Sequence, residues 1–158
     1  MRLPGRPVAQ PTDNAMLRIA LANQQKRHRV DRRRLIAAAK AVLRGEGIRE
    51  ADVSLAVVDD DTIQALNRRD LHHDYATDVL SYVFHRAGDR VEGEVVVSAD
   101  RASAVSSRYG WGAGDELLLY VIHGTLHLVG YDDRTSRQRA SMQSRERQYL
   151  AEFGLTPS

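Results

Sequence analysis

Four stretches of the chain have the hydrophobic pattern of β-strands. Apolar and polar residues alternate over Met16–Asn23, the two-residue period of a strand with one buried face. Runs rich in β-branched residues follow at Val53–Val58, Val79–Phe84 and Val91–Val97. A turn sequence that contains Gly88 separates the last two, so we expect them to form an antiparallel hairpin.

Five further stretches have the three-to-four-residue hydrophobic period of helices. One of them is apolar almost all round, through Leu117–Ile122, and is therefore expected in the core. In a shorter helix we expect Ala102, Val105 and Tyr109 to face inward. Residues that favour N-caps precede the five helices, in order Asp31, Asp59–Asp61, Ser98, Asp115, and Thr135 or Ser136. Their predicted ends include Arg44, Arg68 and Gly154.

The order β-α-β-α-β-β-α-α-α predicts one α/β (α+β) domain over residues 15–155, built on a four-stranded mixed sheet. Of the 158 residues 42% are hydrophobic, which is enough for one core. Residues 1–14 contain three prolines and no apolar segment of the kind found in signal peptides, so we expect a flexible tail.

The chain contains no cysteine, which excludes disulfide partners and thiolate metal ligands. Any metal ion must therefore be held by His, Asp or Glu. No apolar run approaches the roughly 20 residues of a membrane span. We therefore expect a cytoplasmic protein with no membrane partner.

The segment His123–Asp133 has the spacing of a metal site. His123 and His127 are four residues apart, so both imidazoles project from one face of the buried helix. Gly130 can end that helix in a left-handed conformation and let Asp133 return towards the rings. Two imidazoles and one carboxylate form the open three-ligand set of catalytic zinc. Two hydrogen-bonded core histidines are the alternative, which the matched glycine and carboxylate disfavour.

The same offsets occur in the zincin pattern H-E-x-x-H-x-x-G-x-x-H, with one decisive difference. Gly124 stands where a metallopeptidase carries its glutamate general base. Glycine inside a helix costs about 1 kcal/mol relative to alanine, so we expect another segment to approach closely at this position. A zincin-like metallopeptidase is an alternative function, weakened by the missing base.

His123 to Asp132 match every fixed position of H-G-x-L-H-L-x-G-Y-D-H, and in this the chain resembles the YbeY family of bacterial endoribonucleases. Two upstream segments, Asp74–Tyr82 and Gly93–Ser98, are similar to the family blocks T-[DN]-V-L-S-F and G-D-I-x-I-S. The resemblance covers roughly residues 17–150.

This resemblance implies a metal-dependent, single-strand-specific endoribonuclease that matures precursor ribosomal RNA and meets the small ribosomal subunit. It implies one divalent ion, with Zn²⁺ expected, at His123, His127 and Asp133. Asp133 itself departs from the family, which has His there, and a two-His-one-carboxylate set also admits Fe(II). Leu71 replaces an arginine that is proposed to assist catalysis in many members. Which cation takes its place, and whether water or the RNA 2′-hydroxyl attacks, are open from the sequence.

Two further aspartates are candidate catalytic residues. Asp78 begins a strand, where it can accept a proton in the cleft or cap a turn. Asp132 can accept a hydrogen bond from a ligand imidazole or cap the last helix. Tyr109 and Trp111, which lie beside glycines, can stack on a base, although such aromatics more often pack in the core.

Basic residues concentrate in the first 50 positions, which hold twelve of the 23 Lys and Arg but only four of the 21 Asp and Glu. Arginines in the first turn of a helix oppose its dipole, so local stability does not explain them. We interpret the cluster as a surface for single-stranded RNA, with a solvated helix face as the alternative. A non-catalytic ribosome-assembly factor with a structural metal is a further alternative function. The cluster consists of Lys26, Arg27, Arg29, Arg32, Arg33 and Arg34.

Overall fold

The computed structural model of the chain describes residues 15–106 and 110–157. The nine predicted elements are present in the predicted order. The strands are β1 (Met16–Asn23), β2 (Glu50–Val58), β3 (Val79–Ala87) and β4 (Arg90–Ser98). The helices are α1 (Arg32–Gly45), α2 (Asp60–Leu71), α3 (Ala99–Val105), α4 (Ala113–Leu128) and α5 (Ser136–Ala151).

The sheet has the strand order β1-β2-β4-β3. β2 pairs in parallel with β1 on one side and with β4 on the other, whereas β3 and β4 form the predicted antiparallel hairpin. The expected four-stranded mixed sheet is therefore confirmed. A bulge between Val83 and His85 shifts the register near the end of β3. Beyond it Arg86 pairs with Val91, whose side chain is buried on the helical side of the sheet.

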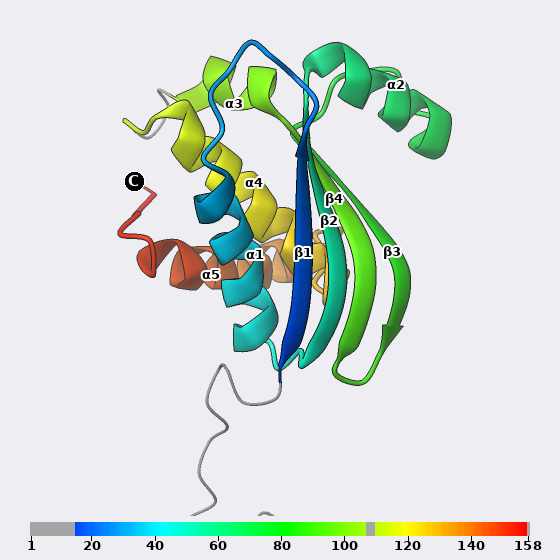
Figure 1. Ribbon diagram of the computed structural model, residues 1–158, viewed down its shortest axis with the longest axis vertical. Helices are drawn as coiled ribbons and strands as arrows, with labels where there is room; N and C mark the ends of the chain where they lie inside the picture. Colours follow the sequence, from blue (N-terminus) through cyan, green and yellow to red (C-terminus); the bar gives the residue numbers. More distant parts are fainter. Residues whose placement is uncertain (1–14, 107–109, 158) are drawn as a thin grey trace, which may run out of the picture.

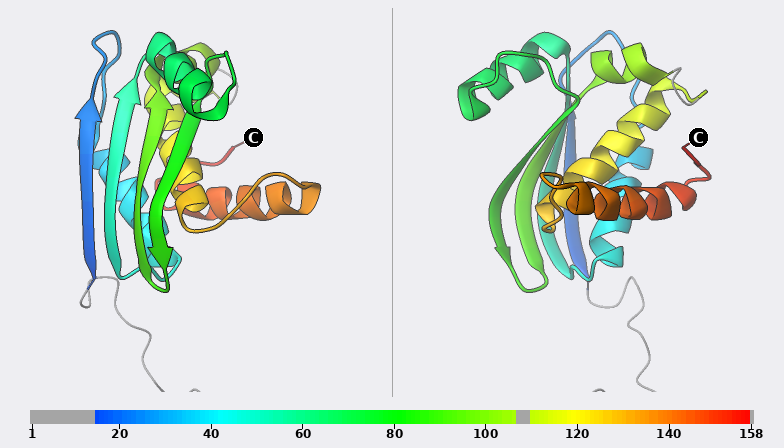
Figure 2. Two further views of the ribbon diagram at one scale, coloured as in Figure 1. Left: turned by 90° about the vertical axis from the view of Figure 1, so that its right-hand side faces the viewer. Right: turned by 180° about the vertical axis from the view of Figure 1, so that it is seen from behind.

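Helices cover the two faces of the sheet unequally (Figures 1 and 2). α1 and α4 pack side by side on one face, with α3 at one end and α5 crossing behind them. α2 lies on the opposite face and covers only one end of it, where Ile63 packs with Val58, Leu80 and Val96. The main core therefore lies between the sheet and the α1–α4 layer.

That core is built from the alternating positions that the sequence pattern predicts. Along β2, Val53, Leu55 and Val57 face the helices and are almost fully buried. α4 meets them with buried side chains along its length, including Leu118 and Ile122, as expected for an apolar helix. Full burial of such a side chain stabilises the fold by roughly 1.5–3 kcal/mol, which makes α4 the best-anchored helix for carrying a site.

Helix capping agrees with the predictions at Asp31, Asp59, Ser98 and Thr135, but differs at α4. The N-cap of α4 is Gly112, three residues before the predicted cap. The carboxylate of Asp115 instead accepts a hydrogen bond from the backbone N–H of Gly112 at 3.1 Å and pairs with Arg34 at 2.7 Å. A carboxylate at the third helical position can therefore accept from the backbone N–H of the N-cap residue, as the glutamate of a capping box does.

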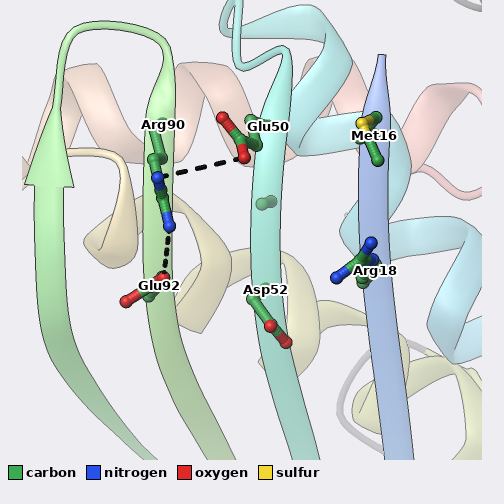
Figure 3. A pocket seen from close by; sticks show the side chains of 7 residues that line it. Met16, Arg18, Glu50, Asp52, Arg90 and Glu92 are labelled. Atoms are coloured by element: carbon green, nitrogen blue, oxygen red, sulfur yellow. Dashed lines mark hydrogen bonds and ion pairs between the residues drawn. The ribbon is translucent and has the colours of Figure 1, made fainter.

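The uncovered part of the outer sheet face carries charged side chains around a shallow hollow (Figure 3). Arg90 pairs with Glu92 at 2.8 Å and with Glu50 on the adjacent strand at 3.9 Å. Arg18 and Asp52 lie in register on β1 and β2. Opposite charges on neighbouring strands stabilise a solvated sheet face, so we assign no site to this hollow.

Two expectations fall outside the described residues. These are the tail over residues 1–14 and the inward orientation of Tyr109. Within the described ranges, no helix combines the length and apolarity needed to cross a bilayer.

Candidate metal centre

The last turn of α4 presents both histidines of the motif to the same side. The rings of His123 and His127 meet edge to face with centroids 4.7 Å apart. Gly130, at a φ of 109°, then reverses the chain as predicted, and the N–H of Tyr131 closes the turn on the carbonyl of Leu126 at 3.1 Å. The chain that follows brings Asp133 back over the two rings.

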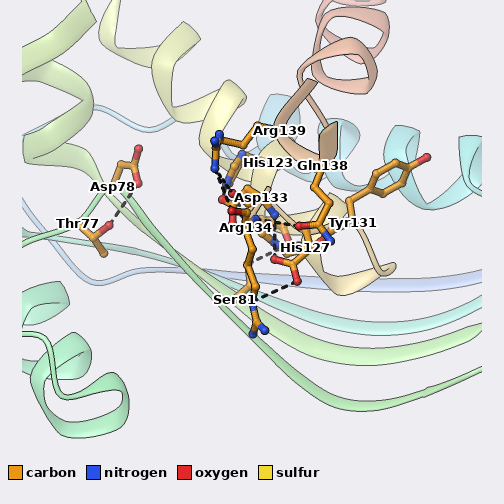
Figure 4. A network of polar contacts seen from close by, with 12 residues as sticks. Thr77, Asp78, Ser81, His123, His127, Tyr131, Asp133, Arg134, Gln138 and Arg139 are labelled. Atoms are coloured by element: carbon orange, nitrogen blue, oxygen red, sulfur yellow. Dashed lines mark hydrogen bonds and ion pairs between the residues drawn. The ribbon is translucent and has the colours of Figure 1, made fainter. Parts of the chain in front are cut away.

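Three ligand atoms converge at this point (Figure 4). The Nε2 atoms of His123 and His127 are 3.1 Å apart, and Oδ2 of Asp133 lies 3.7 Å and 3.4 Å from them. Ligands about 2.05 Å from a tetrahedral ion would be roughly 3.3 Å from one another. The three side chains therefore fit one divalent ion without rearrangement.

The hydrogen bonds of the two rings leave both Nε2 lone pairs facing each other. Nδ1 of His127 donates to the backbone carbonyl of Tyr131 at 3.0 Å, since a carbonyl can only accept. Nδ1 of His123 lies 3.1 Å from the carboxylate of Glu146 on α5, whose side chain is 14% exposed. Two lone pairs and a carboxylate at such short distances repel one another unless a cation lies between them. The donor set therefore suits a metal ion.

The electrostatics of the site point the same way. Burial lowers the pKa of His123, but the hydrogen bond and charge of Glu146, together with the charges of Asp78 and Asp133, outweigh burial and raise that pKa above its usual value. Negative charge thus surrounds the ring, and it favours any cation bound there, whether a proton or a metal ion.

The loop that carries Asp133 is held by its own backbone contacts. Oδ1 of Asp132 accepts from the N–H of Asp133 at 2.8 Å, and its other oxygen lies 3.4 Å from Nε of Arg134. Arg139 donates to the carbonyls of Asp133 and Arg134, at 3.1 Å each. Asp132 thus orients the ligand loop, while the Nδ1 partners of the ligand imidazoles are Glu146 and the Tyr131 carbonyl.

Gly124 lies where α4 approaches the sheet closely, as the presence of a glycine inside a helix predicts. A Cβ atom there would lie 2.4 Å from Cγ1 of Val95 and 3.0 Å from Cγ2 of Val79. The Gly124 carbonyl also accepts from the hydroxyl of Ser81 at 3.0 Å. The position of the zincin glutamate therefore faces the sheet and has no room for a general base.

The ligands line an open cleft between the end of α4, β3 and the loop before α5. Asp78, at the start of β3, lies on its wall apart from the ligand cluster (Figure 4). Leu71, which is 49% exposed at the end of α2, lines the same cleft. Its wall also carries Asp132, Arg86 and Arg134. Both catalytic candidates thus share the cleft with the metal ligands.

The basic cluster lies at the other end of α4. Arg34 pairs with Asp115 in the first turn of α4, about 18 Å by helix rise from His127. Arg27 pairs with Asp100 at 3.2 Å, and Arg32 donates to the carbonyl of Leu21 at 2.6 Å. These three arginines therefore have structural partners that local sequence did not reveal. Trp111 packs against the core, partly buried.

Glu146 and the Tyr131 carbonyl are the two groups of the candidate site that the sequence did not predict. Glu146 lies 23 residues from His123 in the chain, on a helix without a distinctive motif. The Tyr131 carbonyl is a backbone group, so only the fixed tyrosine position could have pointed to it.

A family model described as "Endoribonuclease YbeY" matches residues 20–154. The chain is 42% identical over 117 residues to a protein of Rhodopirellula baltica named endoribonuclease YbeY, covering 73% of this chain and 60% of that one. It is 36% identical over 137 residues to the Syntrophus aciditrophicus protein of the same name, covering 82% and 86%. A solution structure of TM1509 from Thermotoga maritima is 25% identical, covers 85% of this chain and 87% of that one, and superposes with a TM-score of 0.59.

Proposed function

The chain belongs to the endoribonuclease YbeY family, and on that basis we propose that it is a metal-dependent endoribonuclease that cleaves single-stranded RNA. One observation carries the proposal. The three convergent ligand atoms of His123, His127 and Asp133 lie in an open cleft, which leaves a coordination position for a reacting group.

We propose Zn²⁺ as the resident ion, held by His123, His127 and Asp133. When bound, such an ion polarises a phosphoryl oxygen and lowers the pKa of a water molecule to about 7. Fe(II) suits the same set of two imidazoles and one carboxylate, so the metal itself must be measured.

Protein groups would move the protons and fix the geometry. Asp78 lines the cleft without belonging to the ligand set, so its carboxylate is our candidate to accept a proton from the attacking group, whether water or the RNA 2′-hydroxyl. Asp132 would assist by orienting the ligand loop through the N–H of Asp133. Glu146 and the Tyr131 carbonyl would keep each ligand Nε2 free of its proton.

We propose precursor ribosomal RNA as the substrate and the small ribosomal subunit as the partner, which would place the reaction in the cytoplasm. The polyanion surface would include Lys26, Arg29 and Arg33, which extend the RNA path beyond the cleft. Arg27, Arg32 and Arg34 were also candidates, but their structural contacts make them weaker ones.

The alternative functions receive less support. A zincin-like peptidase needs a general base at position 124, where a side chain would collide with the sheet. A non-catalytic assembly factor with a structural metal would normally close the ion off with a fourth protein ligand, whereas this ligand set lines an open cleft.

An RNA cleavage assay with and without chelator tests the proposal. We expect single-stranded RNA to be cut by the metal-loaded protein, and cutting to stop with chelator and in His127→Ala. His85→Ala, which removes an exposed histidine from β3, is the matched control and should cleave normally. Cleavage that persists in both the chelated protein and His127→Ala would refute a role for this metal site.

A further inference from the structure

Arg86 lines the cleft, and its charge is not paired within the part of the chain that the structure describes. Two arginines line the cleft, and Arg134 lies 3.4 Å from the carboxylate of Asp132 with its own side chain 85% exposed. The Arg86 side chain makes no hydrogen bond or ion pair with any of the residues that the structure describes. Its charge is therefore available to a ligand.

The path of β3 directs Arg86 into the cleft. The bulge between Val83 and His85 shifts the strand by one position, so Arg86 pairs with Val91 and shares its face of the sheet. Without the bulge, alternation would turn residue 86 to the outer face, because Tyr82 pairs there with Glu94. The bulge thus lets the Arg86 side chain reach the loop that carries Gly130 and Asp133.

The guanidinium lies directly against that loop. A Cβ atom at Gly130 would be 2.6 Å from Nη1 of Arg86 and 3.3 Å from its Cζ. Only a glycine leaves this space, and the positive φ of Gly130 requires one as well. Gly130 comes three residues after His127 and three before Asp133, and Arg86 lines the same cleft as these two ligand candidates.

The remaining charges of the cleft indicate what Arg86 binds. Asp78, Asp132 and Asp133 make the cleft acidic, which repels a phosphodiester unless cations offset them. An exposed guanidinium recognises a phosphate with two parallel hydrogen bonds. Leu71, on the same cleft, offers only an apolar side chain.

We propose that Arg86 binds a phosphate of the RNA next to the scissile bond, in the role that the arginine missing at Leu71 would otherwise have. This inference rests on the proposed endoribonuclease function and names the residue that holds its substrate.

Equilibrium binding of a single-stranded RNA oligonucleotide, measured across salt concentrations with chelator present to stop cleavage, tests it. Each phosphate contact contributes about −0.7 to the slope of log affinity against log salt. Arg86→Gln should therefore flatten the slope by about 0.7 and lower affinity. The metal content of the variant, measured separately on protein kept free of chelator, should equal that of the wild type. Arg86→Lys keeps the charge and should keep the slope.

Arg18→Gln is the matched control, because it removes an exposed arginine from the outer face of the same sheet. Arg86→Gln and Arg18→Gln with the same slope as wild type would overturn the inference. Adding Leu71→Arg to Arg86→Gln should restore the slope. If it does not, Arg86 does not have the role of an arginine at position 71. A wild type that neither binds nor cleaves RNA would instead overturn the proposed function, and the inference with it.

Discussion

At the scale of single residues, each histidine of the candidate metal centre has a hydrogen-bond partner at Nδ1, which favours one tautomer. Glu146 reaches Nδ1 of His123 from α5, and the carbonyl of Tyr131 reaches Nδ1 of His127 from the loop. Glu146 can be replaced by mutation without changing a ligand, whereas the Tyr131 carbonyl belongs to the backbone. Glu146 is therefore the residue through which the surroundings of the ion can be tested separately from its ligands.

We predict that Glu146→Gln weakens metal binding by about 10- to 100-fold, the usual effect of removing a partner of a ligand histidine. An amide can still accept from Nδ1, but it no longer adds negative charge beside the ring. Competition with a zinc chelator measures the change. Glu152→Gln, at the exposed end of the same helix, removes the same charge and should bind metal like wild type. Equal affinity in both variants would contradict the assigned role of Glu146.

A second residue-scale prediction concerns the contact between α4 and the sheet. Gly124→Ala should destabilise the fold by about 1–3 kcal/mol, because its Cβ would overlap Val95 and Val79. The better helix propensity of alanine returns at most about 1 kcal/mol. Denaturant unfolding gives the free-energy difference.

Gly114→Ala in the first turn of α4 is the matched control for that substitution. Its Cβ would meet no atom closer than 3.8 Å, so this variant should gain stability from helix propensity alone. If Gly124→Ala were stabilising to the same extent, the close approach of α4 to the sheet would be wrong.

At the scale of elements, periodicity predicted all nine helices and strands, because each buries one face and repeats accordingly. Ends were less predictable. β2 begins at Glu50 rather than Val53, since pairing with β4 extends it through residues that have no apolar pattern. The convergence of His123, His127 and Asp133 was predictable because their spacing is local. Glu146 and Arg86 were not, since tertiary packing and a strand bulge bring them to the site.

Asp100 connects three elements and should make their docking sensitive to acid. It accepts from the N–H of Asp60 at the start of α2, from His28 at 2.9 Å and from Arg27. The Asp60 N–H lowers its pKa most, with His28 and Arg27 adding to the effect. A carboxylate with a lowered pKa stabilises the fold above its unfolded pKa of about 3.9, and this stabilisation is lost as the pH falls through the folded value.

We predict that Asp100→Asn lowers the free energy of unfolding at pH 7, and that the gap to wild type closes as the pH drops below about 4. Denaturant titrations between pH 7 and pH 3 measure both curves. Asp52→Asn removes one acidic charge from the exposed sheet face and controls for net charge. A gap that is the same at pH 3 and pH 7 would show that Asp100 acts through packing and not through its charge.

At the scale of the whole molecule, the basic cluster and the candidate metal site lie at opposite ends of α4. Arg34 of the basic cluster pairs with Asp115 in the first turn of this helix, and the candidate metal ligands begin in its last turn, about 18 Å away by helix rise. An RNA that touches both must therefore extend beyond the cleft. A short oligonucleotide can occupy the cleft alone, which separates the two surfaces experimentally.

The cluster itself divides into two groups of three. Arg27, Arg32 and Arg34 are engaged by Asp100, the Leu21 carbonyl and Asp115. The side chains of Lys26, Arg29 and Arg33 have no hydrogen bond or ion pair within residues 15–106 and 110–157. Only the second group can be removed without breaking contacts that stabilise the fold.

We predict that the triple variant Lys26→Gln, Arg29→Gln and Arg33→Gln flattens the salt dependence of binding to a long single-stranded RNA by about 2, at about 0.7 for each phosphate released. Binding of a dinucleotide should keep its slope, because a single phosphodiester in the cleft is too short to reach the first turn of α4, about 18 Å away by helix rise. Metal content and thermal stability should equal those of wild type, since these side chains hold neither the ion nor another element. A triple variant that binds the long RNA with an unaltered slope would show that the cluster is a solvated face. The RNA would then have to leave the cleft along a surface that does not include the start of α1.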